Sequence, residues 1–156
     1  MANLLLPSAD RSVNPYTITA GAAPEPGGVW NRTAYAAAHL VADPLAAADP
    51  WVDCAVDWDT TLAFRAHLWK LGFGVAEAMD TAQRGMGMDW PTSLELIQRS
   101  TALAKAGGHL IASGAGTDHL EVGPNTTIED IIAAYEMQCE AVEAAGSRVI
   151  LMASRA

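Results

Sequence analysis

The feature that most constrains this chain is a regular alternation of apolar segments with helical segments after residue 32. Continuous apolar strands joined by helices are typical of a parallel sheet with right-handed crossovers. Two folds share this local pattern, an open doubly wound sheet and a (β/α) barrel. The expected strands are residues 33–41, 74–79, 109–113 and 148–153.

Each of the three helices expected between these strands has a start signal. Asp57 and Asp89 are N-cap residues, and Pro91 fits the first turn of the second helix. Thr126 and Glu129 have the spacing of a capping box for the third helix. That helix carries the clearest apolar stripe, which we expect to face the sheet. The stripe consists of Ile128, Ile131, Ile132, Tyr135, Cys139 and Val142.

The first 30 residues differ from the rest of the chain. Residues 3–6 and 16–19 are short extended segments around the turn-rich stretch 8–12. A linker rich in proline and glycine follows up to residue 30. We therefore expect an N-terminal β-hairpin and linker in 1–30 and a separate unit in 31–156.

Composition excludes several classes of partner. The net charge is −9, and the nine Lys and Arg form no basic run, which argues against nucleic acid or an anionic membrane. No apolar stretch approaches the roughly 20 residues of a membrane span. The two cysteines form no CxxC pair, and Pro7 ends the only apolar run near the start. These features predict a reduced, cytoplasmic protein without a zinc site.

Polar residues gather directly after the expected strands. The carboxyl ends of parallel strands form one edge, where ligands bind in both candidate folds. Gly114 and Gly116 could let a ligand approach the backbone, although a tight turn also explains them. Residues 86–88 fit either a lid or an ordinary loop. The predicted substrate-binding residues are His39, Glu77, Gln83, Gly114, Gly116, Asp118 and His119.

Two segments resemble the dihydrodipicolinate synthase and N-acetylneuraminate lyase family. Residues 74–83 are similar to its second strand, with residues 80–83 where the family has Thr-Thr-Gly-Glu, and Thr81 matches. Residues 112–116 and 125–129 resemble its Gly-x-Gly turn and Asn-Thr-x-Glu helix start. Much of 30–156 also looks like an uncharacterised dihydrodipicolinate-synthase-like group.

The resemblance implies the N-terminal half, about four βα units, of a (β/α)8 TIM barrel. It also implies a lyase or aldolase that acts on a 2-oxo acid or keto-sugar without a cofactor. By resemblance Thr81 relays a proton and orients the substrate carboxyl group, with Asp80 as the second catalytic candidate. The family's relay tyrosine and Schiff-base lysine come from later strands, whereas Lys70 and Lys105 fall in the last turns of helices. We expect the chain alone to be inactive, and to form a homo-oligomer or to need a missing C-terminal half.

Two other functions remain open at this point. A metal-dependent sugar isomerase or hydrolase could use His39, Glu77, Asp118 and His119 as ligands of a divalent ion. A non-catalytic half-barrel that pairs with another chain would instead need none of these residues for chemistry.

Overall fold

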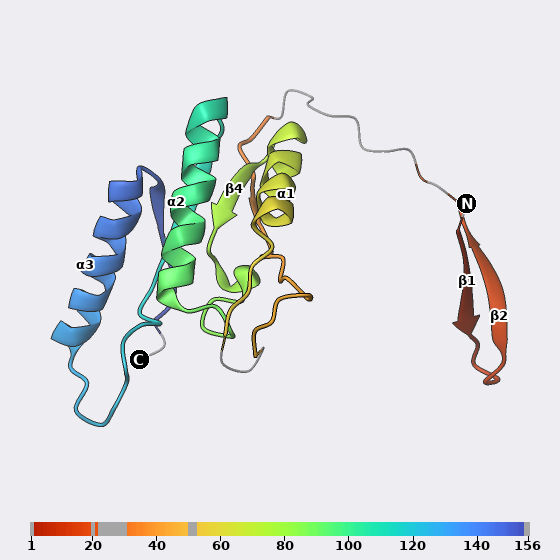
Figure 1. The fold of residues 1–156 in the computed structure, drawn as a ribbon, viewed down its shortest axis with the longest axis horizontal. Helices are drawn as coiled ribbons and strands as arrows, with labels where there is room; N and C mark the ends of the chain where they lie inside the picture. The colour runs from red at the N-terminus through yellow and green to blue at the C-terminus, as the bar shows by residue number, and fades with distance from the viewer. Residues whose placement is uncertain (1, 20, 22–30, 50–52, 155–156) are drawn as a thin grey trace.

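A computed structural model of the protein describes residues 2–19, 21, 31–49 and 53–154. Figure 1 shows a hairpin at the N-terminus and an α/β unit in the rest of the chain. The elements are β1 (Ala2–Pro7), β2 (Val13–Ile18), β3 (Tyr35–Ala37), α1 (Trp58–Lys70), β4 (Gly74–Glu77), η1 (Asp80–Ala82), α2 (Trp90–Gly107), β5 (Ile111–Ala115), α3 (Ile128–Ala145) and β6 (Arg148–Leu151).

The predicted N-terminal hairpin is confirmed. β1 and β2 pair antiparallel with Leu4 opposite Tyr16, and Asp10 accepts hydrogen bonds from Ser12 in the connecting turn. Residues 3–18 are exposed, and Figure 1 shows the hairpin apart from the α/β unit. The predicted linker lies largely outside the described residues, because residues 20 and 22–30 are not described.

The other four strands form one parallel sheet in the order β3-β4-β5-β6. The expected sequential strand order is therefore confirmed. Figure 1 shows α1, α2 and α3 side by side on one side of this sheet. Because α1 and α2 each run back from the carboxyl end of one strand to the start of the next, the loops that precede them lie at the carboxyl edge.

The predicted barrel class is wrong for this chain. β3 and β6 are the outer strands of an open four-stranded sheet, and β1 and β2 form a separate antiparallel sheet. The described residues hold three α-helices, so they do not complete four βα units. The prediction failed because βα alternation is a local pattern shared by open and closed sheets, and it does not encode which outer strands pair.

Two apolar clusters join the helices to the sheet. Val75 and Ile111 of the central strands pack with Trp69 of α1 and Ala104 of α2. In the second cluster, Met88 and the α2 residues Leu96 and Ile97 pack with Val142 of α3. Each fully buried aliphatic side chain of this kind contributes roughly 1.5–3 kcal/mol. None of the described helices is both long and apolar enough to cross a bilayer.

The helix starts agree with the sequence at two of three positions. Asp57 and Asp89 accept backbone N–H groups as N-caps, and Pro91 lies in the first turn of α2. The capping box of α3 is formed by Thr127 and Asp130 rather than by Thr126 and Glu129. Two adjacent threonines are followed by two adjacent acidic residues, with Ile128 between the pairs, so the sequence permits both registers of the capping box and did not distinguish them.

The predicted apolar stripe of α3 is only partly correct. Ile128 and Ile132 are 70% and 50% exposed, whereas Gln138 is fully buried beside Val142. A polar residue therefore occupies the sheet-facing side of α3, and a hydrophobic pattern cannot reveal that.

Replacing Thr127 with alanine is expected to destabilise the protein by about 1 kcal/mol, the usual cost of losing an N-cap. Thr127 Oγ1 accepts the backbone N–H of Asp130 at 3.2 Å. Urea unfolding of Thr127→Ala and of Thr127→Ser, which keeps the capping hydroxyl, measures the difference. Equal losses for the two variants would contradict the capping box observed here.

Candidate ligand pocket at the carboxyl edge of the sheet

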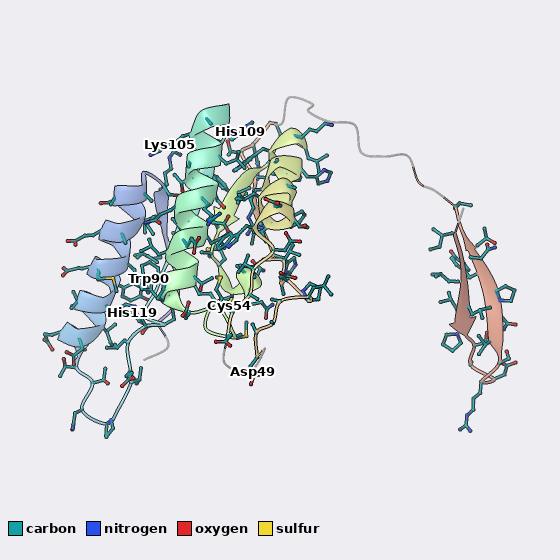
Figure 2. All side chains as sticks on the ribbon, viewed as in Figure 1. Asp49, Cys54, Trp90, Lys105, His109 and His119 are labelled. Atoms are coloured by element: carbon teal, nitrogen blue, oxygen red, sulfur yellow. The ribbon has the colours of Figure 1, made fainter. Side chains whose placement is uncertain are left out.

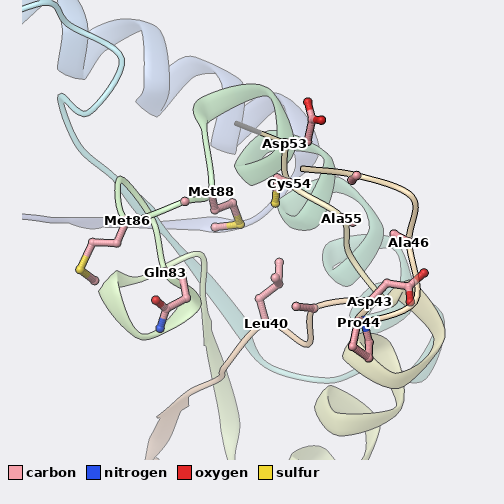
Figure 3. A pocket seen from close by; sticks show the side chains of 13 residues that line it. Leu40, Asp43, Pro44, Ala46, Asp53, Cys54, Ala55, Gln83, Met86 and Met88 are labelled. Atoms are coloured by element: carbon pink, nitrogen blue, oxygen red, sulfur yellow. The ribbon is translucent and has the colours of Figure 1, made fainter. Parts of the chain in front are cut away.

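A pocket of about 440 Å³ lies at the carboxyl edge of the sheet, among the segments that follow β3 and β4. Figure 3 shows the side chains that enclose it. Small-molecule sites typically enclose about 300–1,000 Å³. The lining residues are Leu40, Ala42, Asp43, Pro44, Ala46, Ala48, Asp53, Cys54, Ala55, Gln83, Met86, Gly87 and Met88.

The first wall is the long connection between β3 and α1. Its two ends are tied together where Asp43 N–H donates to the Ala55 carbonyl at 3.0 Å and Asp57 N–H donates to the Val41 carbonyl at 2.9 Å. The buried Thr61 hydroxyl accepts the Val41 N–H at 3.0 Å. These bonds fix the base of the loop, so residues 43–55 form a wall with a defined position.

The second wall is the segment after η1. Gln83 has left-handed backbone angles, with φ 64°, which any non-glycine residue adopts only at some cost. Its carbonyl accepts the N–H groups of Met86 at 2.8 Å and Met88 at 3.2 Å. Met88 is buried and Met86 is 60% exposed. The segment therefore closes as a hydrogen-bonded turn that presents the Gln83 amide and two methionines to the pocket.

The charged lining of the pocket is acidic. Asp43 and Asp53 carry the formal charges, and no Lys, Arg or His belongs to its described lining. Cys54 adds a thiol, shown near Met88 in Figure 3. Burial and then the charge of Asp89 raise the pKa of this thiol, although a hydrogen bond with Thr92 opposes them. The pocket thus combines apolar walls, a neutral thiol and oxygen acceptors.

Arg84, next to Gln83, points away from the pocket into the protein. It is fully buried, and its guanidinium contacts both oxygens of Asp118, the nearest at 2.8 Å. It also donates to the Gly114 carbonyl at 2.6 Å and to the Gln138 side chain. The Trp90 ring lies 5.0 Å from its charged carbon.

Asp118 is held ionised by this arrangement. Burial favours the neutral acid, but the hydrogen bonds and charge of Arg84, helped by Gln138, outweigh it and lower the pKa of Asp118. Arg84 and Asp118 thereby join the segment after β4 to the segment after β5. Arg84, which follows the lining residue Gln83 in the chain, is thus paired with Asp118.

A second buried ion pair joins α1 to the end of β4. Arg65 of α1 donates from Nε and Nη2 to the two oxygens of Glu77, both at 2.8 Å, and both side chains are fully buried. Arg65 also donates to the carbonyls of His39 and Thr61. A direct contact between Glu77 and a ligand would require breaking this bidentate pair.

The predicted site residues are only partly brought together. His39 Nδ1 lies 3.0 Å from the Thr81 carbonyl, which joins the ends of β3 and β4. Asp80 begins η1 in the same segment, and its carbonyl accepts the Gln83 N–H at 3.0 Å. Among the predicted site residues, Gln83 alone belongs to the described lining of the pocket.

The two predicted glycines have a packing explanation. A Cβ on Gly114 would lie 2.8 Å from the Ala78 carbonyl and 2.9 Å from the Met152 sulfur, so a larger residue does not fit. A Cβ on Gly116 would lie 3.0 Å from the terminal methyl carbon of Met152, and the Gly116 N–H donates to Gln138 Oε1 at 2.7 Å. Close approach of neighbouring protein groups, rather than of a ligand, accounts for both positions.

Within the described residues, no group of three or more His, Cys, Asp or Glu side chains is placed to hold a metal ion. Of the four alternative metal ligands, Glu77 is paired with Arg65 and Asp118 with Arg84. His119 Nδ1 lies 2.7 Å from the Gln138 amide nitrogen. These three side chains therefore have other partners than a common ion.

Neither lysine lies near the pocket. Figure 2 shows Lys105 and His109 at one end of the α/β unit, with Cys54, Trp90 and His119 at the other. Lys105 Nζ donates to the Ala145 carbonyl at the end of α3. Lys70 ends α1, close to the amino end of β4.

Sequence reasoning missed three buried side chains that hydrogen-bond the segments of the carboxyl edge to one another: Arg65, Arg84 and Gln138. One signal was available, because Thr61, Arg65 and Trp69 are spaced by four and share the buried face of α1. An arginine on the inner face of a helix needs a buried counter-charge, and Glu77 at the end of a strand supplies it.

Fold and pocket together describe an α/β protein with a pocket of about 440 Å³ at the carboxyl edge of a parallel sheet. Residues 4–156 match the family described as "Protein of unknown function (DUF993)". The chain therefore belongs to the DUF993 family. No curated protein matches it.

Proposed function

We propose that the chain binds a small keto-sugar in the pocket at the carboxyl edge, as the substrate-binding part of a carbon–carbon lyase of the aldolase type. The observation that carries the proposal is the pocket itself, with Gln83, Asp43 and Asp53 set among apolar walls. The lyase class comes from the resemblance of residues 74–83 and 112–116 to the dihydrodipicolinate synthase family.

The charges of the pocket favour a neutral sugar over a 2-oxo acid. The side-chain oxygens of Asp43 and Asp53 accept hydrogen bonds from hydroxyl groups, and their formal charges repel a carboxylate. The nearby Arg84 is already paired with Asp118, so it is not placed to neutralise an acid. Leu40, Pro44 and the methionines suit the C–H surface of a sugar.

The chain's own part in this reaction is to bind and orient the substrate. Lys70 and Lys105 lie at the far end of the unit, too far from the pocket to form a Schiff base there. Gln83 is placed to hold a hydroxyl or carbonyl oxygen, because an amide both donates and accepts hydrogen bonds.

Cys54 provides a direct test, because its thiol lines the pocket while Cys139 lies on α3. Dihydroxyacetone is expected to slow alkylation of Cys54 by iodoacetamide and to leave Cys139 unchanged, as measured by peptide mass spectrometry. Pyruvate at the same concentration is expected to protect neither thiol. Gln83→Asn should weaken the protection, since asparagine tolerates the left-handed backbone but has a shorter side chain.

Two outcomes would contradict the proposal. Equal protection by pyruvate would show that the pocket does not select against anions. Borohydride reduction that attached dihydroxyacetone to Lys70 or Lys105 would show that the chain supplies the Schiff base itself. Gln98→Ala, on the exposed side of α2, is the matched control for Gln83→Asn.

A further inference from the structure

His119 follows β5 in the turn 117–120, at the same edge of the sheet as the pocket. Its ring is tilted against Trp90, with ring centroids 6.2 Å apart. Gln138 of α3 is fully buried between His119 and Arg84. The groups around the Gln138 amide settle which of its two ends carries the oxygen.

One end of the Gln138 amide faces two groups that can only donate. The Arg84 guanidinium and the Gly116 N–H, at 2.7 Å, both point to it. Neither group has an acceptor atom there, so this end is the carbonyl oxygen Oε1. The other end is therefore the amino group Nε2, which donates to Asp118 Oδ1 at 3.1 Å and to His119 Nδ1 at 2.7 Å.

We infer that Arg84 and Gln138 are positioning residues that hold His119 as the neutral tautomer with its proton on Nε2, so that Nε2 can only donate a hydrogen bond. His119 Nδ1 uses its lone pair to accept the N–H of Gln138. A proton on Nδ1 would place two N–H donors opposite each other with no acceptor between them. The ionised Asp118 accepts the second Gln138 hydrogen and prevents the amide from turning over.

This arrangement determines the chemistry that His119 can perform. A neutral imidazole with Nε2–H donates a hydrogen bond, and in this form Nε2 has no lone pair for a metal ion or an incoming proton. A group that met Nε2 would have to be an acceptor, such as a carbonyl or hydroxyl oxygen. The tautomer does not depend on the proposed function.

Long-range ¹H–¹⁵N correlation spectra of the labelled chain measure the tautomer directly. At pH about 8 an ordinary histidine, with a pKa of about 6.5, is neutral. His119 is expected to show an unprotonated Nδ1 and a protonated Nε2. In Gln138→Glu the carboxylate can only accept, so the proton should move to Nδ1. His109, stacked on Trp69 with ring centroids 5.0 Å apart, should be unchanged in both proteins.

A proton on Nδ1 of His119 in the unmodified protein would overturn the inference. That spectrum decides the matter even if Gln138→Glu does not fold. If Cys54 is not protected but the tautomer is as expected, the proposed sugar binding fails and the positioning roles of Arg84 and Gln138 stand.

Discussion

Replacing Glu77 with alanine is expected to lower the free energy of unfolding by about 3–5 kcal/mol, because it leaves the Arg65 guanidinium buried without a counter-charge. Both side chains are fully inaccessible to solvent, and the pair is bidentate at 2.8 Å. A typical domain is stable by only about 5–15 kcal/mol. The variant should therefore unfold at a much lower urea concentration, followed by circular dichroism.

The double variant Arg65→Met/Glu77→Leu is the control for charge. Removing both charges and keeping apolar volume should recover most of the loss, since a buried pair often contributes little net stability over apolar residues. If the double variant were as unstable as Glu77→Ala, lost packing rather than an unpaired charge would be the cause. Glu77→Gln keeps the shape of the side chain, so its free energy of unfolding should lie between those of Glu77→Ala and the double variant.

The sheet could be predicted because its signals are local. The apolar strands predicted at 74–79, 109–113 and 148–153 correspond to β4, β5 and β6. Asp57 and Asp89 cap α1 and α2, as predicted. The length of the first strand was overestimated, because β3 has three residues and the rest of 33–41 is loop. Apolar alanines in that stretch are compatible with either conformation.

The closure of the sheet could not be predicted in the same way. A barrel differs from an open sheet only in the pairing of its outermost strands, which no segment of the sequence expresses by itself. The hairpin, by contrast, was predictable, because β1 and β2 are joined by a turn of five residues and pair with each other.

The candidate site was predicted in place but not in composition. The rule that ligands bind at the carboxyl edge led to residues 77–83 and 114–119, and the pocket lies at that edge. Which side chains face the pocket depends on turns such as the left-handed Gln83, which sends Gln83 outward and Arg84 inward. Asp43 follows the expected strand 33–41, so the same rule covers it, whereas Asp53 and Cys54 come from a loop that had no sequence signal for a site.

Replacing Arg84 with methionine is expected to cost about 3–5 kcal/mol, because Asp118 would lose its counter-charge in a nearly inaccessible position. The Gly114 carbonyl and the Gln138 oxygen would lose a donor at the same time. Urea unfolding at neutral pH measures the loss. Arg99→Met is the matched control, because the Arg99–Glu95 pair is about half exposed and such pairs contribute roughly 0–1 kcal/mol.

The same pair predicts how stability depends on pH. The folded protein lowers the pKa of Asp118, so its ionised form adds stability at pH values above its unfolded pKa of about 3.9. That contribution disappears as the pH falls through the lower folded pKa. The difference in stability between the unmodified protein and Asp118→Asn should therefore be full at pH 7 and shrink below pH about 4. A difference that stayed constant down to the acid transition would show that Asp118 contributes through packing and neutral hydrogen bonds, and that Arg84 does not act on it as a charge.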